Sequence, residues 1–412
     1  MNLAYVSLAA LVIAILVSCF TELNVGILAL ALAWAVGVYV GGMPLNEVTS
    51  GFPVSLFLTL SGVTLLFTQA QLNGTLDRIA HRAVRVCRGN AGLIPIAFFV
   101  LGCSLASMGP GNVSTAALLA PMAMAVAGRA GIPAFLMIIM VGNGAQAGSL
   151  SPFAPTGVIV NGLMEKIGLA GYEWRTYWTN LAAHAIVAFG GYAMFGGLKL
   201  FSSGSVVSIE QRPEDVQFDK ANLITIAVIA ALLIGVLFFG VNVGMGAFAG
   251  AVILAVAGAA DHKDAVKKMP WSVILMMSGV TVLISLMERT GGLDLFTSAL
   301  ALLATPGTIT GVIAFVTGLI SVYSSTSGVV LPAFLPTIPG LVERLGGGDP
   351  LAIAASMNIG AHLVDLSPLS TTGALCIAAV APGENVRSVF NKLLAWGLSM
   401  TVVGAVLCYL FF

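Results

Sequence analysis

The chain has 412 residues, of which 58% are hydrophobic and only 8% are charged, and its formal net charge is zero. Soluble domains carry about a quarter charged residues, so this composition excludes a soluble domain and predicts an all-α polytopic membrane protein. A neutral chain also offers no basic surface for nucleic acid. The five cysteines and four histidines show no metal-ligand spacing, and no H-E-x-x-H motif occurs. We therefore expect that the protein binds no cofactor and is not an enzyme.

Plain membrane spans are the easiest elements to find. A helix needs about 20 apolar residues to cross the hydrocarbon core. Runs near that length predict eight spans, at residues 3–20, 25–42, 54–71, 178–200, 221–240, 243–260, 271–288 and 393–412. The hydrophilic linker 201–219 divides the chain into a first part, 1–200, and a second part, 220–412.

Two further stretches, 91–165 and 305–380, are hydrophobic but are broken repeatedly by Gly, Pro, Asn, Ser and Thr. Polar breaks at membrane depth are tolerated only where the backbone is buried in protein or lines a cavity. We therefore predict that each stretch forms a re-entrant hairpin followed by a discontinuous helix. The chain then has ten crossings and two hairpins.

The two parts of the chain repeat one another. Ser61-Gly62-Val63-Thr64 returns in the second part as Ser278-Gly279-Val280-Thr281, and Ser151-Pro152 with Thr156-Gly157 returns at nearly the same offset as Ser367-Pro368 with Thr372-Gly373. Five crossings in each copy is an odd number, which places the second copy upside down. Inverted repeats are typical of secondary transporters, which bind their substrate between the copies near the bilayer midplane.

The distribution of Lys and Arg predicts the orientation. If the linker is cytoplasmic, 13 of the 17 basic residues lie on the cytoplasmic side, and the other side holds only Lys166, Arg175, Arg289 and Arg344. The positive-inside rule favours this orientation, with both termini outside. The amphipathic segment 75–89 then lies on the cytoplasmic surface, and its nearly uncharged counterpart, 292–304, lies on the outer surface.

The hairpins turn at residues 108–115 and 323–328, and the discontinuous helices break at residues 143–157 and 360–373. We expect four half-helix ends to converge at the centre. Their N-termini can hold an anion without Lys or Arg, and freed carbonyls beside Ser and Thr oxygens suit Na⁺.

The candidate substrate-binding residues all lie at these turns and breaks: Asn112, Ser114, Thr115, Ser151, Thr156, Tyr323, Ser325, Thr326, Ser367 and Thr372. The candidates for coupling a cation are Asn112, Asn143, His362 and Asp365, because an ionisable residue inside the membrane is a functional candidate by default. In the alternative interpretation the small residues form packing faces and kinks, Asp365 caps a half-helix, and His362 is a core residue.

The paired hairpins and broken helices resemble the ion transporter superfamily, which includes divalent anion/sodium symporters. The S-G-V-T-x-L block and the hairpin sequence G-N-V-S-T-A-A-L-L-A-P look most like the malonate carrier (MatC-type) group of dicarboxylate transporters. The symporters carry Ser-Asn-Thr at each hairpin tip, which contacts a substrate carboxylate and helps to form a Na⁺ site. Here Gly111-Asn112-Val113 and Val322-Tyr323-Ser324 stand at those positions, so only Asn112 matches.

The resemblance implies an elevator mechanism, in which the hairpins and broken helices slide against a dimeric scaffold of plain spans and segments 75–89 and 292–304 join the two. We expect a homodimeric symporter of the bacterial inner membrane that imports malonate or a C4-dicarboxylate with Na⁺ or H⁺. Na⁺ would bind at the junctions of the hairpins and broken helices. The alternatives are a carrier or exchanger of another anion, such as a sulfonate, citrate or an oxyanion, and a passive anion channel.

Overall fold

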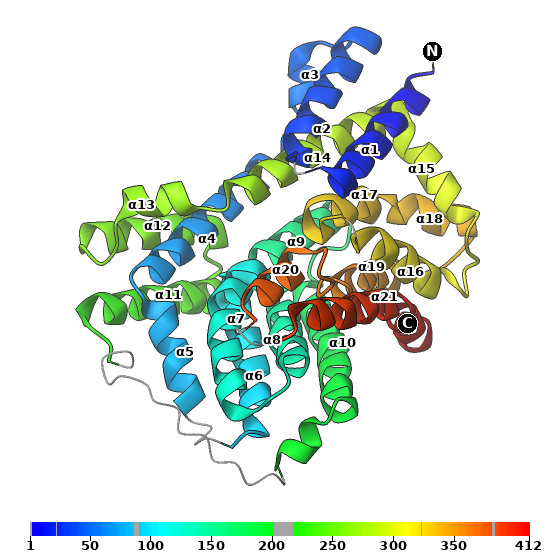
Figure 1. The fold of residues 1–412 in the computed structure, drawn as a ribbon. Helices are drawn as coiled ribbons and strands as arrows, with labels where there is room; N and C mark the ends of the chain where they lie inside the picture. Colours follow the sequence, from blue (N-terminus) through cyan, green and yellow to red (C-terminus); the bar gives the residue numbers. More distant parts are fainter. Residues whose placement is uncertain (1, 22, 86–89, 202–216, 323, 381–383) are drawn as a thin grey trace.

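The computed structural model describes residues 2–21, 23–85, 90–201, 217–322, 324–380 and 384–412 (Figure 1). These residues form helices and connecting turns and include no β-strand, so the all-α prediction is confirmed for them. Most of the predicted linker, residues 202–216, lies outside the described part of the chain, as do residues 86–89 of the predicted surface segment 75–89.

Six of the plain spans form helices close to their predicted positions. They are α1 (Leu3–Phe20), α2 (Val25–Trp34), α4 (Val54–Leu72), α11 (Lys220–Phe239), α12 (Val243–Val256) and α14 (Trp271–Thr290), and the π-helical segment η1 (Ala35–Val40) extends α2. We call this set the outer helices. Two short helices connect outer helices, α3 (Leu45–Thr49) and α13 (His262–Lys268), and two others lead from the outer helices to the rest of the chain, α5 (Thr75–Arg85) and α15 (Gly292–Ala301).

The remaining helices form a second bundle, here called the inner bundle. From the first part of the chain it contains α6 (Leu93–Met108), α7 (Gly111–Ala130), α8 (Ala134–Gly148), α9 (Pro155–Lys166), α10 (Glu173–Met194) and the 3₁₀ turn η2 (Gly197–Phe201). From the second part it contains α16 (Ile309–Ser321), the π-helical segment η4 (Thr326–Val330), α17 (Leu331–Phe334), the 3₁₀ turn η5 (Leu335–Thr337), α18 (Ile338–Leu345), α19 (Pro350–Leu363), α20 (Thr371–Ala378) and α21 (Val386–Phe411).

Each part of the chain packs its outer helices against those of the other part: α2 lies beside α14, and α12 lies beside α4 (Figure 1). Glycines bring these backbones together. A Cβ atom on Gly279 would lie 2.0 Å from the carbonyl oxygen of Gly26, and one on Gly62 would lie 2.4 Å from that of Gly244. The two contacts are related by the repeat in the sequence, in which Gly26 of Asn24-Val25-Gly26 corresponds to Gly244 of Asn242-Val243-Gly244, and Gly62 to Gly279. Both have the close backbone approach that small residues give helices in lipid.

The inner bundle has one such contact in each part of the chain, and the two match. A Cβ atom on Gly144 of α8 would lie 2.4 Å from the carbonyl oxygen of Phe99 on α6. One on Gly360 of α19 would lie 2.3 Å from that of Ala314 on α16. The hairpin limbs α6 and α16 are therefore fixed against the first halves of the broken helices.

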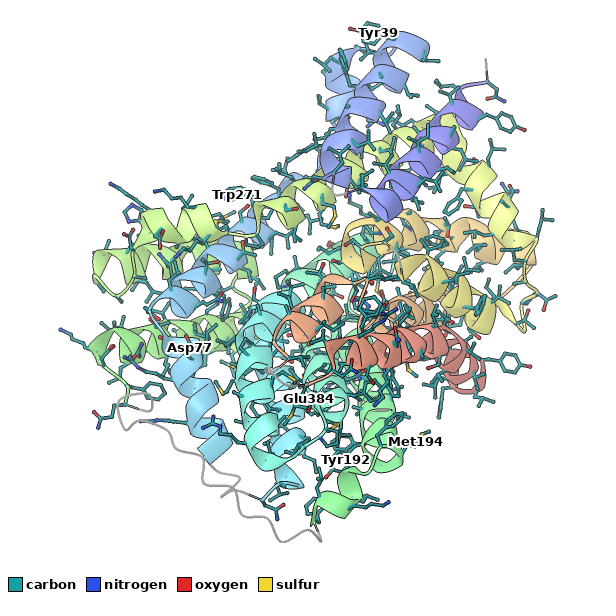
Figure 2. All side chains as sticks on the ribbon, viewed as in Figure 1. Tyr39, Asp77, Tyr192, Met194, Trp271 and Glu384 are labelled. Carbon is teal, nitrogen blue, oxygen red and sulfur yellow. The ribbon has the colours of Figure 1, made fainter. Side chains whose placement is uncertain are left out.

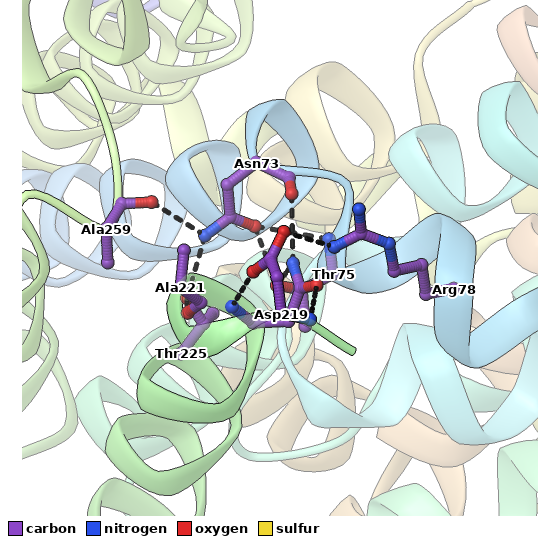
Figure 3. Close-up of polar contacts among 8 residues, drawn as sticks. Asn73, Thr75, Arg78, Asp219, Ala221, Thr225 and Ala259 are labelled. Atoms are coloured by element: carbon purple, nitrogen blue, oxygen red, sulfur yellow. Dashed lines mark hydrogen bonds and ion pairs between the residues drawn. The ribbon is translucent and has the colours of Figure 1, made fainter. Parts of the chain in front are cut away.

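A polar joint connects α5 to the outer helices (Figure 3). Asn73, at the end of α4, donates from Nδ2 to Thr225 Oγ1 of α11 at 2.8 Å and to the carbonyl oxygen of Ala259 at 3.1 Å. Asp219 caps α11 through the backbone N–H of Asn222 and forms an ion pair of 2.8 Å with Arg78 of α5. The start of α5 is thereby tied to the start of α11, at the far end of the linker.

Large apolar side chains face outward from the outer and inner helices. Figure 2 shows Tyr39 and Met194 at the periphery of the molecule, where they are 70% and 79% exposed. Five helical stretches among the described residues are long and apolar enough to cross a membrane: Val54–Leu72, Gly111–Ala130, Trp271–Thr290, Thr326–Leu345 and Val386–Phe411. An apolar exterior on long apolar helices is the construction of a multi-pass membrane protein.

Candidate functional site

The first hairpin turns sharply between α6 and α7 at Gly109-Pro110-Gly111. Gly109 and Gly111 have positive φ angles of 140° and 76°, which a glycine adopts without strain. A Cβ atom on Gly109 would lie 1.9 Å from the ring of Phe67 on α4, so the tip packs directly against an outer helix. Asn112 and Ser114 follow in the first turn of α7 and are half-buried.

The second hairpin turns between α16 and η4. Ser325 caps η4, with its Oγ accepting from the backbone N–H of Gly328 at 3.1 Å, and Thr326 is the first residue of the π-helical turn. A Cβ atom on Gly328 would lie 2.0 Å from Met276 on α14, so this tip also contacts an outer helix. Tyr323, a predicted substrate-binding residue, lies outside the described residues.

Both predicted breaks interrupt their helices. α8 ends at Gly148 and α9 begins at Pro155, whereas α19 ends at Leu363 and α20 begins at Thr371. The glycine of the Thr-Gly pair is required at each break for the same steric reason. A Cβ atom on Gly157 would lie 1.9 Å from the carbonyl oxygen of Ser151, and one on Gly373 would lie 2.0 Å from that of Ser367. The repeated Ser-Pro and Thr-Gly pairs therefore shape the same tight backbone turn twice.

The hairpins and broken helices pack crosswise between the two parts. α20 contacts α7 of the first hairpin, and α9 contacts η4, α17 and η5 of the second. The N-terminal ends of α7, α9, η4 and α20 thus belong to one connected set of elements. No Lys or Arg occurs at residues 108–115, 143–157, 322–328 or 358–373. The groups in these segments that can attract an anion are therefore helix N-termini and hydroxyl groups.

A hydrogen-bonded network crosses between the two parts at this place. Thr326 Oγ1 donates to Asp365 Oδ1 at 2.6 Å. Gln146 Nε2 donates to Asp365 Oδ2 at 3.3 Å and lies 3.4 Å from Thr372 Oγ1, while Gln146 Oε1 accepts from Asn112 Nδ2 at 3.0 Å. The network therefore joins one residue from each hairpin to residues of both broken helices, and it contains four of the predicted site residues.

Asp365 is half-buried and follows the end of α19. Its backbone carbonyl accepts a hydrogen bond from Ser370 Oγ, which also caps α20 by accepting from the backbone N–H of Gly373 at 3.2 Å. The cap of α20 is thus Ser370, whereas the carboxylate of Asp365 points to Thr326 and Gln146. A carboxylate that accepts from two neutral donors and carries no basic partner is suited to hold a cation or a proton.

The other predicted residues divide by accessibility. Ser114 and Ser325 are half-buried at the hairpin tips, whereas Thr115, Ser151, Thr156 and Ser367 are buried. Ser151 Oγ donates to the carbonyl oxygen of Ser107 at 2.7 Å, which ties the first break to α6. Ser367 Oγ accepts from the backbone N–H of Leu369 at 3.3 Å. The hydroxyls of Ser151 and Ser367 thus hold the local backbone at the breaks.

Asn143 and His362 lie away from this network. Asn143 is fully buried, donates to the carbonyl oxygen of Ile139 at 2.9 Å and lies 2.9 Å from Nδ1 of His184 on α10. His362 is also buried and turns its Nδ1 to the carbonyl oxygen of Asn358 at 2.8 Å. Their role in cation coupling stays a prediction, because the structure places both side chains among packed helices.

Gln146 is the central residue that sequence reasoning missed. It stands in the first part of the chain at the place that His362 occupies in the second, at the offset that relates the two Ser-Pro pairs. An amide is neither ionisable nor rare in a broken helix, so composition gave it no weight. Its correspondence to His362 in the repeat is the feature of the sequence that indicates a site residue, because a polar residue and an ionisable residue occupy the same position of the two copies.

Comparison by sequence finds proteins that are similar to this chain. Residues 1–149 match the family model of the dicarboxylate carrier protein MatC N-terminus. Uncharacterized transporters from two strains of Mycobacterium tuberculosis, CDC 1551 / Oshkosh and H37Rv, are each 24% identical over 345 residues, which covers 75% of this chain and 78% of the relative.

A solved structure has a similar fold over nearly the whole length. The YdaH transporter of Alcanivorax borkumensis, whose crystal structure is described as revealing an unusual topology, superposes with a TM-score of 0.62 and covers 99% of this chain and 97% of its own, at 17% identity. The resemblance inferred from the S-G-V-T-x-L block and the first hairpin is confirmed, since residues 1–149, which contain both, match the MatC dicarboxylate carrier family.

Proposed function

We propose that this protein is a secondary active transporter that imports a small dicarboxylate, malonate or a C4-dicarboxylate, by symport with Na⁺ or H⁺. The observation that carries the proposal is the network around Asp365, in which a half-buried carboxylate lies beside both hairpins and both broken helices. The match of residues 1–149 to the dicarboxylate carrier family supports the substrate class.

The anion site in this proposal is formed by helix ends. Helices begin here at α7, α9, η4 and α20, and the backbone N–H groups of a first turn have no acceptor within their own helix, although Ser325 and Ser370 each cap one of them. Asn112, Ser114 and Ser325 add polar side chains that are half-buried. A dicarboxylate has two anionic groups, which suits a site with one hairpin tip from each part of the chain. Asp365 holds the coupling cation and offsets the charge of the bound anion.

We also propose that the two parts are inverted repeats that work as an elevator, with the inner bundle moving against the outer helices. Related glycine contacts support the repeat: Gly26 with Gly279 and Gly62 with Gly244 between outer helices, and Gly144 and Gly360 inside the bundle. In this proposal α5 and α15 are the surface arms that connect the moving and fixed parts.

The proposal places the protein in the bacterial inner membrane as a homodimer, with the linker 201–219 in the cytoplasm and both termini outside. Native mass spectrometry of the purified protein measures the oligomeric state, and a monomer would reject the dimer. Labelling of single cysteines in the linker and at the C-terminus with a membrane-impermeant maleimide, in intact cells and in lysates, measures the orientation.

Transport in proteoliposomes tests the function. Labelled malonate and succinate are offered under an inward Na⁺ gradient, an inward H⁺ gradient, or neither. We expect accumulation of at least one dicarboxylate under one of the cation gradients and none without a gradient. Absence of dicarboxylate uptake under every gradient would reject the proposal, and uptake that ignores the gradient would indicate a passive channel.

A carrier of another anion is the second candidate, and one observation favours it. The hairpin tips lack the Ser-Asn-Thr pattern of the dicarboxylate symporters, and backbone dipoles attract anions without selecting one. Thermal-shift measurements of the purified protein against malonate, succinate, citrate, a sulfonate and arsenite distinguish the candidates, because a ligand that binds only the folded state raises its melting temperature.

A further inference from the structure

Gln146 contacts both Asn112, a hairpin residue proposed to bind the substrate, and Asp365, whose carboxylate is proposed to bind the cation. It is fully buried near the end of α8. Its Oε1 accepts from Asn112 Nδ2 at 3.0 Å, and its Nε2 donates to Asp365 Oδ2 at 3.3 Å. The side chain therefore lies between two functions that a symporter must connect.

The direction of these hydrogen bonds follows from Asp365. An ionised carboxylate only accepts, so Gln146 must turn its NH₂ group toward it. The carbonyl end of the same amide then faces the first hairpin, where it accepts from the NH₂ group of Asn112. When Asp365 is charged and binds no cation, the NH₂ group of Asn112 therefore donates to Gln146 and is not available to a substrate.

A cation on Asp365 reverses this requirement. A proton on Oδ2 turns the carboxyl group into a donor, which needs an acceptor, and Na⁺ at the same place needs oxygen ligands. In either case Gln146 is favoured with Oε1 toward Asp365 and Nε2 toward Asn112. Asn112 must then present its own carbonyl oxygen to Gln146, and its NH₂ group turns away, free to donate to a substrate carboxylate.

The surroundings of Gln146 permit this half-turn of the amide. Its backbone carbonyl accepts from Asn180 Nδ2 at 2.9 Å and from Ser149 Oγ at 2.7 Å, so the main chain is held in place. Thr372 Oγ1, 3.4 Å from Nε2, is a hydroxyl that can accept from an NH₂ group or donate to a carbonyl oxygen. The same partners therefore serve both orientations.

Few titratable groups surround Asp365. The elements α8, α16, η4 and α17, which contact α19, contain no Lys, Arg, Asp, Glu or His. The charged residues of α18 and α21, which also contact α19, are exposed: Glu343, Arg344, Arg387 and Lys392. On α19 itself His362 faces the carbonyl oxygen of Asn358, and on α10 His184 faces Asn143. The thiols of Cys376 on α20 and Cys408 on α21 are buried. Asp365 is the group of this set that contacts Gln146.

We propose that Gln146 is the residue that couples cation binding to substrate binding: a cation on Asp365 reverses the Asp365–Gln146–Asn112 hydrogen-bond chain and so frees the Asn112 amide for a substrate carboxylate. This inference rests on the proposed symport function and names the side chain that carries its coupling. Gln146 acts through Asn112 and Asp365, so it is a positioning residue.

The test measures the coupling itself. Isothermal titration of the purified full chain with malonate gives its Kd with and without saturating Na⁺, and, in the absence of Na⁺, at acidic and alkaline pH. In the wild type we expect the effective cation to tighten malonate binding by about 5- to 150-fold, the usual range for linked sites. The coupling ratio is the malonate Kd without the cation divided by the Kd with it. In Gln146→Met, which keeps the length of the side chain and loses the amide, we expect this ratio to fall to within about twofold of one.

The matched control is Ser149→Ala, which removes only a hydroxyl bonded to the backbone carbonyl of Gln146 and leaves the chain intact. It should keep the wild-type ratio. A wild-type ratio in folded Gln146→Met, or a ratio of one in the wild type, would overturn the inference. If Gln146→Met does not fold, Asn112→Ala breaks the chain at its other end and must also abolish the ratio. Failure of every dicarboxylate to bind the wild type would instead reject the proposed function.

Discussion

At the scale of single residues, Asp365 carries the strongest prediction. Asp365→Asn keeps the shape of the side chain and its contact with Thr326 but removes the negative charge that we propose holds a cation. We expect gradient-driven dicarboxylate uptake to fall at least about tenfold, in line with typical coupling energies, while the melting temperature stays close to that of the wild type. Uptake in proteoliposomes and thermal unfolding in detergent measure the two quantities.

The control for this variant is Asp349→Asn, because Asp349 caps α19 through the backbone N–H of Leu351 and Asn caps a helix equally well. It should change neither quantity. Unaltered uptake and cation dependence in Asp365→Asn would mean that Asp365 has a purely structural role.

The sequence identified the residues whose type is unusual in a membrane, and it missed those whose role depends on a partner. Asp365 stood out because a charge in an apolar stretch is costly. Gln146 did not, since its importance lies in facing Asn112 and Asp365 from another helix. Nor does the sequence indicate that Asn143 bonds His184 across two helices. Such pairings form only when the chain is folded.

At the scale of helices, close backbone packing predicts which glycines tolerate a side chain. Gly144→Ala or Gly360→Ala places a methyl group 2.4 Å or 2.3 Å from a carbonyl oxygen of the neighbouring helix, which must shift away. We expect each to lower stability by about 1–3 kcal/mol, the usual cost of overpacking. The decrease in apparent melting temperature in detergent, followed by circular dichroism, measures the effect.

Gly162→Ala in α9 is the control, because nothing lies within 4 Å of its Cβ position. In a helix that change should be neutral or stabilising by up to about 1 kcal/mol. Equal melting temperatures for Gly144→Ala and Gly162→Ala would contradict the close packing of α6 against α8.

The polar joint at the start of α11 gives a pH-dependent prediction. The pKa of Asp219 is lowered from its ordinary value of 3.8, first by the hydrogen bond from the backbone N–H of Asn222 and then by the charge of Arg78. A lowered pKa means that the charged form stabilises the fold above pH 3.8 and that this contribution is lost as the pH falls through the lowered pKa.

Asp219→Ala should therefore melt at a lower temperature than the wild type at neutral pH, and the difference should shrink under acid conditions below pH 3.8. Thermal unfolding across this pH range is the measurement. Asp264→Ala, which removes only an exposed ion pair of 2.9 Å with Lys268, is the control and should have little effect at either pH. A difference that does not depend on pH would exclude a contribution from the ionised carboxylate.

Helix existence was more predictable than helix ends. The spans expected at 178–200 and 393–412 form α10 (Glu173–Met194) and α21 (Val386–Phe411), so both begin before the apolar run does. Polar and charged residues occupy those first turns, where hydropathy predicts a loop but the backbone already forms helical hydrogen bonds. The positions of the two helix breaks could be predicted from the sequence, because Ser-Pro and Thr-Gly pairs impose a local backbone geometry that does not depend on distant partners.

At the scale of the whole molecule, the repeat predicted that two similar units exist but not how they interlock. The offset between the copies relates Gly62 to Gly279 without saying that each contacts a helix from the other part of the chain. Similarly, Ser7 bonds Thr290 at 2.7 Å and Asn73 bonds Thr225 at 2.8 Å, so both joints between outer helices cross the linker. Neither half can complete these contacts alone, which makes the outer helices one structural unit.

The elevator proposal has a direct consequence for the contacts between the inner bundle and the outer helices. The second hairpin meets α14 where the Cβ position of Gly328 lies 2.0 Å from Met276, and a sliding inner bundle must break this contact in each cycle. In a background with the native cysteines replaced, we expect the pair Met276→Cys and Gly328→Cys to cross-link on oxidation.

The cross-link should nearly abolish uptake in proteoliposomes, and reduction should restore it, while malonate binding measured by calorimetry persists because Asp365 and both hairpin tips stay in place. Each single cysteine variant, treated with the same oxidant, should transport like the background protein. Full uptake by the cross-linked protein would mean that the second hairpin stays fixed on α14 during transport. The moving part would then have to be smaller than the inner bundle, and the crosswise contacts of α20 with α7 and of α9 with η4 would mark where it separates.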